Sequence, residues 1–367
     1  MPSSKKSAAK LIGMPWDFSA LMNEAIRSLP ERSLQKREHI WASEIGGDYA
    51  SRYLRMFAHK MTNPPNDRSR RKFISGHIFE WIVQLILTMC GVLKEKQLHG
   101  TVELKGLLRV TGKLDFIAGG DVDWEKAKAE VESMKRLFSV ALGDMPPIIL
   151  HSVERVLFRM EQMFTRVPLK EVIMEVKSVS SFVSDLMEKT QKPRPRHPFQ
   201  ILHYEIANKM DDGQLLYINK DSFYCHQFEV TPTKQLVKEY KDDVAKMTEY
   251  IRGAGKNFLK NIPAKSPEIL FYDEEFRFAK NTDVEYSNYL TFLYGYKDFE
   301  EFNYKWKYKI PAWNRVFKRA VRGDNITPAN TVIIKDAVAN FPQWDKYVAK
   351  AKAAGAFQKP EEENDDE

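Results

Sequence analysis

Cysteine is scarce in this sequence: Cys90 and Cys225 are the only two among 367 residues, and they lie far apart. Two isolated cysteines exclude a disulfide framework and a four-cysteine metal site. Such a low cysteine content fits a protein of a reducing compartment.

Long apolar runs are missing as well. The most apolar stretch, Trp81–Leu93, includes Gln84 and Thr88 and is too short to span a bilayer. The N-terminal stretch MPSSKKSAAKLIGMPW contains lysines but no apolar core of a signal peptide. The sequence also shows no internal repeat. We therefore expect a globular, cytoplasmic protein with no membrane partner.

Basic charge, by contrast, is in excess. The formal net charge is +7, and six of the acidic residues lie in the last seven positions, EEENDDE, so the rest of the chain carries 7 + 6, that is +13. A basic body of this kind attracts polyanions. The acidic tail, 358–367, is predicted to be disordered.

Residue patterns predict an α/β protein. Alternating and β-branched residues predict two strands within 101–120 and further strands at 172–176, 214–219 and 223–230. Apolar residues at three- and four-residue spacing predict helices over 16–60, 69–90 and 231–253, and one beginning near 199. The predicted domains are an N-terminal helical extension (1–40), a core (41–260) with a helical insertion at about 121–168, and a helical, aromatic-rich C-terminal region (261–357).

Two of the predicted strands contain carboxylates in otherwise apolar surroundings. Asp115 lies in GKLDFI and Glu175 in VIMEVKS. A buried carboxylate costs stability unless something pairs with it, so the two strands predict a shared partner. The pattern Glu-x-Lys occurs three times in the chain, but only Glu175-Val-Lys177 ends an apolar strand. Side chains two apart on a strand point to the same face, so Glu175 and Lys177 would project together.

Two pairs at four-residue spacing surround these strands. Gly76 and Glu80 lie on the predicted early helix, and Gln200 and Tyr204 lie on one face of a later helix. Each feature alone is equally compatible with an ordinary ion pair or a packed helix residue. Together and in this order they resemble the PD-(D/E)XK nuclease superfamily, especially its RecB-like and lambda-exonuclease-like branches. The segment ASEIGGDYASRYL, 42–54, resembles the first helix of RecB-like nucleases, and the whole resemblance covers roughly residues 40–260.

The resemblance implies a restriction-endonuclease-like core, in which helices flank a central mixed β-sheet. It also implies a Mg²⁺ or Mn²⁺ site, whose ligands would be Glu80, Asp115, Glu175 and the main-chain carbonyl of Val176. His77 is an alternative to Glu80, although family spacing from Gly76 favours Glu80 and one helix could present both. Such cations prefer oxygen ligands and neutralise phosphate charge during hydrolysis.

Three further residues receive roles from the resemblance. Lys177 would orient or deprotonate the attacking water, or offset phosphate charge. Gln200 and Tyr204 would hold the phosphate or brace Lys177.

The chain departs from the family at two points. Iron–sulfur members of the RecB-like branch need four cysteines, and Asp48 stands near the place of the first, so we expect no iron–sulfur cluster. The separation between Asp115 and Glu175 is long for the family, which implies the insertion at 121–168. That insertion is either a DNA-gripping subdomain or a packing elaboration.

Basic and aromatic clusters supply candidate contacts to nucleic acid. The basic candidates for phosphate contacts are Arg68, Arg70, Arg71, Lys72, Lys192, Arg194 and Arg196. A solvated helix flank and a solvated loop are the alternative interpretation. The aromatic run 292–308 is expected to pack in a core, with a base-stacking platform as the alternative.

These observations lead to one functional prediction with open alternatives. The resemblance implies a metal-dependent DNA nuclease, preferably an exonuclease of DNA recombination, repair or phage DNA processing, in a bacterial or host cytosol. DNA is the expected partner, and a recombination protein or further copies of this chain are compatible with it. The alternatives are an endonuclease with the same site, a catalytically silent DNA-binding or assembly protein on the same fold, and a nucleic-acid-binding protein of unrelated fold.

Overall fold

The computed structural model describes residues 34–120, 169–273 and 275–357, together with some isolated residues outside these ranges. The chain divides into two compact units. The first comprises most of the chain up to Ile262, and the second comprises Pro263 onward together with Asp48–Ser51 and Lys60–Pro64. Each unit is described by itself.

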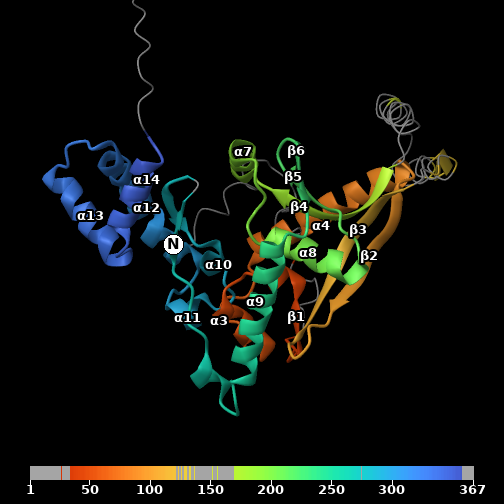
Figure 1. The fold of residues 1–367 in the computed structure, drawn as a ribbon, viewed down its shortest axis with the longest axis horizontal. Helices are drawn as coiled ribbons and strands as arrows, with labels where there is room; N and C mark the ends of the chain where they lie inside the picture. Colours follow the sequence, from red (N-terminus) through yellow and green to blue (C-terminus); the bar gives the residue numbers. More distant parts are fainter. Residues whose placement is uncertain are drawn as a thin grey trace, which may run out of the picture. The chain divides into compact units, whose positions relative to one another are not determined.

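Six strands among the described residues form one mixed sheet in the first unit (Figure 1). The strands are β1 (His39–Trp41), β2 (Leu93–Val102), β3 (Arg109–Gly120), β4 (Leu169–Val179), β5 (Gly213–Asn219) and β6 (Cys225–Val230). Their order is β1-β3-β4-β5-β6, with β2 also paired to β3. The pairs β1–β3 and β4–β5 are parallel, and the other pairs are antiparallel.

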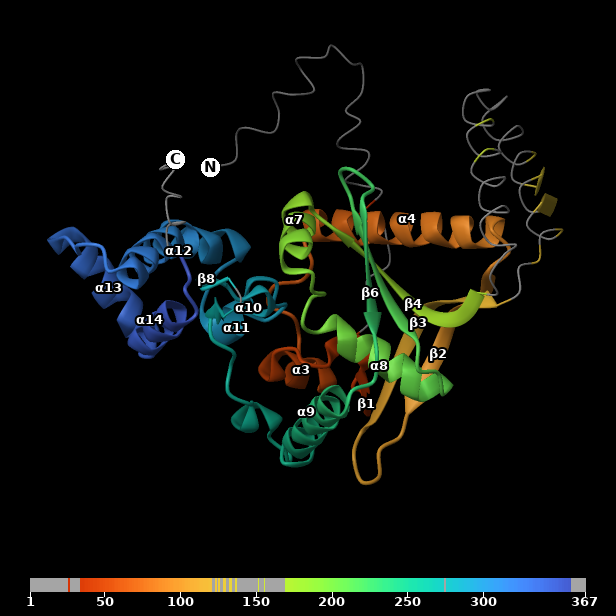
Figure 2. The same ribbon diagram turned by 45° about the horizontal axis from the view of Figure 1, so that its top comes forward.

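Helices cover both faces of this sheet. The described helices of the first unit are α3 (Tyr49–Met56), α4 (Asp67–Met89), α7 (Ser181–Thr190), α8 (His197–Asn208) and α9 (Lys234–Arg252), with short 3₁₀ turns η1 (Ala42–Glu44) and η2 (Phe258–Asn261). Helices α4 and α8 lie on opposite sides of the strands (Figure 2).

The α4 side of the sheet is an apolar layer. Phe79 and Val83 of α4 pack on Phe116 of β3, Val176 of β4 and Ile218 of β5, all of them buried. Burying side chains of this size contributes about 1.5–3 kcal/mol each relative to exposure. This layer holds β3, β4 and β5 in place beneath α4.

The α8 side is fitted closely to two glycines. A Cβ on Gly112 of β3 would lie 2.7 Å from Cε1 of Tyr204, and one on Gly100 of β2 would lie 3.0 Å from Cβ of Ala207. Only glycine lets α8 approach the strands this closely. Tyr204 is thereby buried directly above β3.

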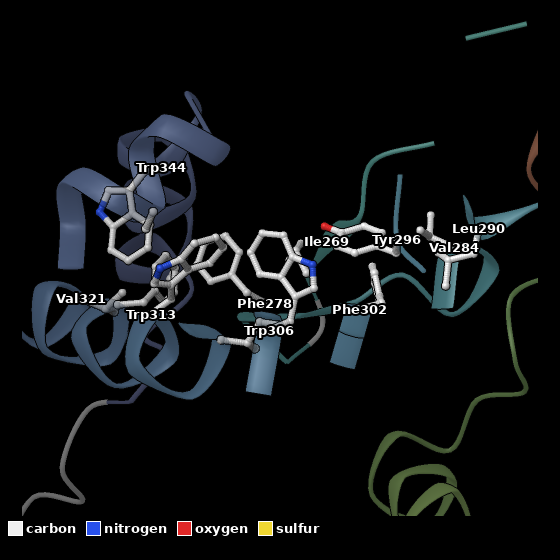
Figure 3. Packing of buried hydrophobic residues seen from close by; sticks show 14 residues of the cluster. Ile269, Phe278, Val284, Leu290, Tyr296, Phe302, Trp306, Trp313, Val321 and Trp344 are labelled. Carbon is white, nitrogen blue, oxygen red and sulfur yellow. The ribbon is translucent and has the colours of Figure 1, made fainter. Parts of the chain in front are cut away.

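The second unit is a helical assembly with a β-hairpin. Its elements are β7 (Ile269–Tyr272), β8 (Arg277–Lys280), α10 (Thr282–Glu285), α11 (Leu290–Tyr294), α12 (Phe299–Arg322), α13 (Pro328–Asn340) and α14 (Trp344–Ala353). Its core is rich in aromatic rings (Figure 3). Phe278 of β8 stacks on Trp344 of α14 with ring centroids 5.3 Å apart, and Trp313 Nε1 donates to Asp336 Oδ2 at 2.9 Å.

The predicted fold class is confirmed: a central mixed sheet is flanked by helices and a helical region follows it. Most of the predicted elements between 69 and 253 are present with small shifts at their ends, but the first strand predicted within 101–120 is β2, which lies mainly before that range. The predicted helix over 16–60 is confirmed at α3 (Tyr49–Met56) but is wrong at residues 39–41, which form β1 and pair with β3. The C-terminal region also contains the unpredicted β7–β8 hairpin.

Some predictions fall outside the described residues. These are the tail 358–367, nearly all of the insertion at 121–168, and most of the N-terminal extension. The predicted domain boundaries therefore stay predictions. In the part of the chain that is described, no helix has both the length and the apolar character needed to cross a bilayer.

Candidate active site

The two carboxylates singled out in the sequence lie side by side on neighbouring strands. The antiparallel register pairs Phe116 with Met174, which places Asp115 beside Glu175. Asp115 Oδ2 accepts a hydrogen bond from the main-chain N–H of Val176 at 2.9 Å. Both side chains are buried, Asp115 at 9% exposure and Glu175 at 3%.

The carboxylate of Glu175 is held asymmetrically. Its Oε1 accepts hydrogen bonds from Lys177 Nζ at 2.5 Å and from Gln200 Nε2 at 2.6 Å. Its Oε2 is buried and has no hydrogen-bond partner among the described residues. A buried charged oxygen without a partner costs free energy, so this atom is suited to a ligand that supplies positive charge.

Gln200 and Tyr204 continue the chain of hydrogen bonds across the sheet. Gln200 Nε2 lies 3.1 Å from the hydroxyl of Tyr204, and that hydroxyl donates to the carbonyl of Lys113 on β3 at 2.8 Å. The four-residue spacing thus places both side chains on the sheet-facing side of α8. They fix Glu175 and contact β3 close to Asp115.

Burial and the neighbouring charges shift the pKa values of the site residues. Burial, followed by the negative charge of Glu175, raises the pKa of Asp115 to about 8. Burial also raises the pKa of Glu175, against the opposing effect of Lys177. Burial alone would lower the pKa of Lys177, but the carboxylates of Glu175 and Asp115 outweigh it and keep that pKa above its ordinary value.

Glu80 and His77 stand at the edge of this group. The charge of Glu80 contributes to the pKa shifts of Asp115 and Glu175. Its Oε1 accepts a hydrogen bond from Gln97 on β2. His77 Nδ1 lies 3.4 Å from Glu80 Oε2, and the His77 side chain is 74% exposed. Glu80 is therefore the partly buried one of the two, whereas His77 points largely to solvent.

Gln97 is a site residue that no sequence pattern indicated. It adopts φ +54°, a left-handed conformation that is uncommon outside glycine. The register of β2 and β3 runs from Leu98–Leu114 to Lys96–Phe116, so Gln97 stands opposite Asp115. Backbone outliers of this kind cluster at functional sites. A glutamine in a charged strand gives no sign in the sequence of this backbone conformation or of its place near the site.

The donor atoms fit a divalent cation, although the described residues do not form a closed cage. No group of three His, Cys, Asp or Glu side chains in the described part of the chain is arranged to hold a metal ion. Mg²⁺ needs few protein ligands, because it keeps several waters. Asp115, the free Oε2 of Glu175 and the Val176 carbonyl are oxygen donors of the required kind, and a cation would relieve the repulsion between the two carboxylates.

The predicted basic residues fall into two groups. Arg194 and Arg196 precede α8, and their charges, together with that of Lys177, lower the pKa of half-buried His197 after the larger effect of burial. The Arg196 side chain lies against Gly46 and Gly47. The charges of Arg194, Arg196 and Lys177 thus act on the same residue, His197.

The other basic group lies at the start of α4. Arg70 Nε donates to the carbonyl of Pro65 at 3.3 Å, and the charge of Lys72 contributes, after burial, to a lowered pKa of Lys220. Arg71 follows Arg70 on α4 and is exposed. Lys192 belongs with Arg194 and Arg196 in the loop between α7 and α8, and it is exposed too. The side chain of Arg68 is outside the described part.

His197 is a second residue that the sequence did not single out, apart from its place in the basic loop KPRPRHP. Its Nδ1 lies 2.7 Å from the hydroxyl of Tyr217, which also accepts from the N–H of Arg194 at 3.1 Å. Tyr217 pairs in register with Lys177 across β4 and β5. This contact fixes the start of α8, and with it Gln200, over the strand that carries Lys177.

Comparison with known proteins gives distant likenesses only. No family model matches the chain, and no curated protein matches it. An alkaline exonuclease from Laribacter hongkongensis, LHK-Exo, is similar at 10% identity and a TM-score of 0.33, over 59% of this chain and 90% of that one. Its complex with dAMP is similar at 11% identity and a TM-score of 0.36, over 61% and 94% of the two chains. These values are too low to assign a family or an activity.

Proposed function

We propose that this protein is a metal-dependent DNA nuclease of the PD-(D/E)XK kind, and that it acts as an exonuclease. The observation that carries the proposal is the buried pair Asp115 and Glu175, with Lys177 on one Glu175 oxygen and no partner among the described residues on the other. An ordinary structural ion pair would not need a second buried carboxylate beside it. Two adjacent buried carboxylates are costly when both are ionised, and a bound cation would stabilise that doubly ionised form.

The chemistry follows from the placement of the side chains. A bound Mg²⁺ or Mn²⁺ would neutralise charge on the scissile phosphate and lower the pKa of a water. Asp115, Glu175 and the Val176 carbonyl would hold that cation, with Glu80 nearby as a further carboxylate. Lys177 is held by Glu175 in its charged form, so it would orient the attacking water and offset phosphate charge.

Gln200 and Tyr204 would position the Glu175 carboxylate and the strands around it. Gln200 fixes Oε1 of Glu175, which leaves Oε2 for the cation. Tyr204 ties α8 to β3 through the Lys113 carbonyl, so the strands bearing Asp115 and Glu175 keep one separation. Basic residues near the site, Arg194 foremost, would contact DNA phosphates.

The test is digestion of end-labelled linear DNA and closed circular DNA with Mg²⁺, Mn²⁺ or EDTA. Lys177→Ala is compared with Lys241→Ala, which removes an exposed lysine from the Glu-x-Lys pattern on α9 and serves as the matched control. We expect wild type and Lys241→Ala to degrade linear DNA only, with metal, and Lys177→Ala to be inactive. Cutting of circles would instead favour the endonuclease. DNA binding without cleavage under any metal would favour the catalytically silent protein.

A further inference from the structure

Helix α12 of the second unit has two faces of different character. Its inner face contributes to the aromatic core through Phe302, Trp306, Ile310, Trp313, Phe317 and Val321, several of which Figure 3 labels. Within the aromatic run 292–308 the core of this unit takes in Tyr294, Tyr296, Phe302 and Trp306, in agreement with the expectation of core packing. The core does not take in two other tyrosines of the same run.

Tyr304 and Tyr308 lie on the outer face of α12. Their exposed fractions are 74% and 65%, which are high for tyrosine side chains. Their rings meet edge to face with centroids 6.4 Å apart, and Lys307 Nζ lies 5.2 Å from the Tyr308 centroid. Neither tyrosine hydroxyl forms a hydrogen bond with a described residue. Because the two rings are exposed, they add little to the stability of the fold through burial. They are available to a partner.

Basic side chains continue the same face toward the end of the helix. Residues 304, 308, 311, 315, 318 and 322 recur at alternating spacings of four and three, which keeps them on one side of a helix. The exposed basic members of this face are Arg315, Lys318, Arg319 and Arg322. From Tyr304 to Arg322 the face is about 27 Å long.

These cations are not neutralised within the described part of the chain. No described carboxylate forms an ion pair with Arg315, Lys318, Arg319 or Arg322. The acidic residues of α12, Glu300 and Glu301, lie in its first turn, where their negative charges interact favourably with the positive end of the helix dipole. The outer face therefore joins two exposed rings to a basic stripe that no described carboxylate neutralises.

We infer that this outer face of α12 binds single-stranded nucleic acid, separately from the carboxylate site. Aromatic rings stack on bases without regard to sequence, and adjacent cations neutralise the backbone. A duplex hides its base faces and would leave both rings unused, which favours a single strand over a double one. The inference rests on the proposed function only for the choice of DNA as the polymer.

The test measures binding alone. Fluorescence anisotropy with labelled oligo(dT) is recorded in EDTA, where the proposed cleavage cannot occur. Tyr304→Leu/Tyr308→Leu removes both rings, and Tyr304→Phe/Tyr308→Phe keeps them. We expect the leucine variant to bind about tenfold or more weakly and the phenylalanine variant to bind like wild type.

Charge is tested with a matched pair. Arg315→Gln/Arg319→Gln should lower the slope of log Kd against log salt by about 0.7 for each charge removed. Lys346→Gln/Lys352→Gln removes two exposed charges from α14 of the same unit and should change affinity less. Circular dichroism melting verifies that each variant is folded.

Two results would overturn the inference. One is wild-type affinity in the folded leucine variant, and the other is an equal loss in the α14 control. Cleavage assays on the same proteins separate the two proposals. An inactive enzyme with ring-dependent binding would refute the nuclease alone, whereas an active enzyme with ring-independent binding would refute the α12 surface alone.

Discussion

The two oxygens of the Glu175 carboxylate meet different surroundings, and this difference defines the candidate site at the scale of single residues. One oxygen is fixed by Lys177 and Gln200, while the other is buried without a described partner. Such an arrangement costs stability, which is common where a protein reserves an atom for a ligand.

Asp115→Asn should separate stability from activity. Because the pKa of Asp115 is about 8, its carboxyl is largely protonated at pH 7 without a cation, and asparagine resembles that form. We expect the free energy of unfolding in EDTA to stay within about 1 kcal/mol of wild type. Cleavage should fall by more than about 100-fold. Urea denaturation and the DNA digestion assay measure the two quantities, and retained cleavage would remove Asp115 from the site.

Tyr204→Phe tests the link between α8 and β3. The change deletes the hydroxyl that donates to the Lys113 carbonyl and accepts from Gln200. Leaving these buried groups unpaired should lower the free energy of unfolding by about 1–3 kcal/mol. Loss of positioning should also slow cleavage about 10- to 100-fold without abolishing it. Unchanged cleavage would show that Tyr204 acts only in packing.

Glu205 gives a pH-dependent prediction. It is buried on α8, neither carboxyl oxygen has a described hydrogen-bond partner, and burial followed by Asp211 and Asp212 raises its pKa to about 8. The folded protein therefore holds a proton that the unfolded chain releases near pH 4.5. Stability from this group is complete below that pH and falls by up to about 1.4 kcal/mol per pH unit as the pH rises toward 8.

Replacement of Glu205 by glutamine should flatten this dependence. Chemical denaturation of Glu205→Gln at several pH values between 5 and 8 is the measurement. Parallel slopes for variant and wild type would show that another group is responsible.

At the scale of elements, the two glycines near the site should respond in opposite ways to the same change. A Cβ on Gly112 would meet the Tyr204 ring at 2.7 Å and Ala42 Cβ at 2.8 Å, so Gly112→Ala should destabilise the protein by about 1–3 kcal/mol. A Cβ on Gly76 of α4 would find only Ser178 Oγ, at 3.7 Å. Gly76→Ala should therefore stabilise α4 by about 0.5–1 kcal/mol. Thermal melting of both variants checks the contrast, and a destabilised Gly76→Ala would contradict it.

The same scale shows what the sequence could predict. A long amphipathic segment such as α9 is predictable because many residues repeat one pattern, and Thr233 caps this helix by accepting from Leu236 N–H at 3.1 Å. Strand β1 has only three residues and exists through its pairing with β3, so local pattern could not indicate it. The strands of the β7–β8 hairpin have only four residues each, too few for an alternating pattern to indicate them.

The candidate site was predictable in part for a similar reason. Asp115, Glu175 and Lys177 stand out in apolar strands, and Gln200 and Tyr204 share a helix face. Only the resemblance to the PD-(D/E)XK superfamily selected them as one site, and the fold brings all five together. Their catalytic roles stay predictions. Gln97 and His197 could not be found, because a left-handed backbone and a contact between distant segments leave no periodic trace.

For the whole molecule, charge balance governs binding to a polyanion. Without its last seven residues the chain would carry 7 + 6 formal positive charges. Phe357 precedes the tail, and its carbonyl accepts from Arg322 Nε at 2.8 Å, so the acidic sequence is attached at the basic end of α12. Deletion of residues 361–367 should therefore strengthen DNA binding at low salt, and the gain should shrink as salt screens the charges. Anisotropy titrations at two salt concentrations measure this, and a gain independent of salt would argue against charge competition.

Gly120 at the end of β3 pairs with Leu169 at the start of β4. The segment that connects them therefore leaves β3 and enters β4 at neighbouring positions, whatever the length of that segment. Closing a flexible loop costs only about 0.6 kcal/mol for each doubling of its length. Evolution could thus lengthen, shorten or exchange this segment while Asp115 and Glu175 kept their register. The hairpin end is a natural graft point, at which a new module could be added to the chemistry without rebuilding it.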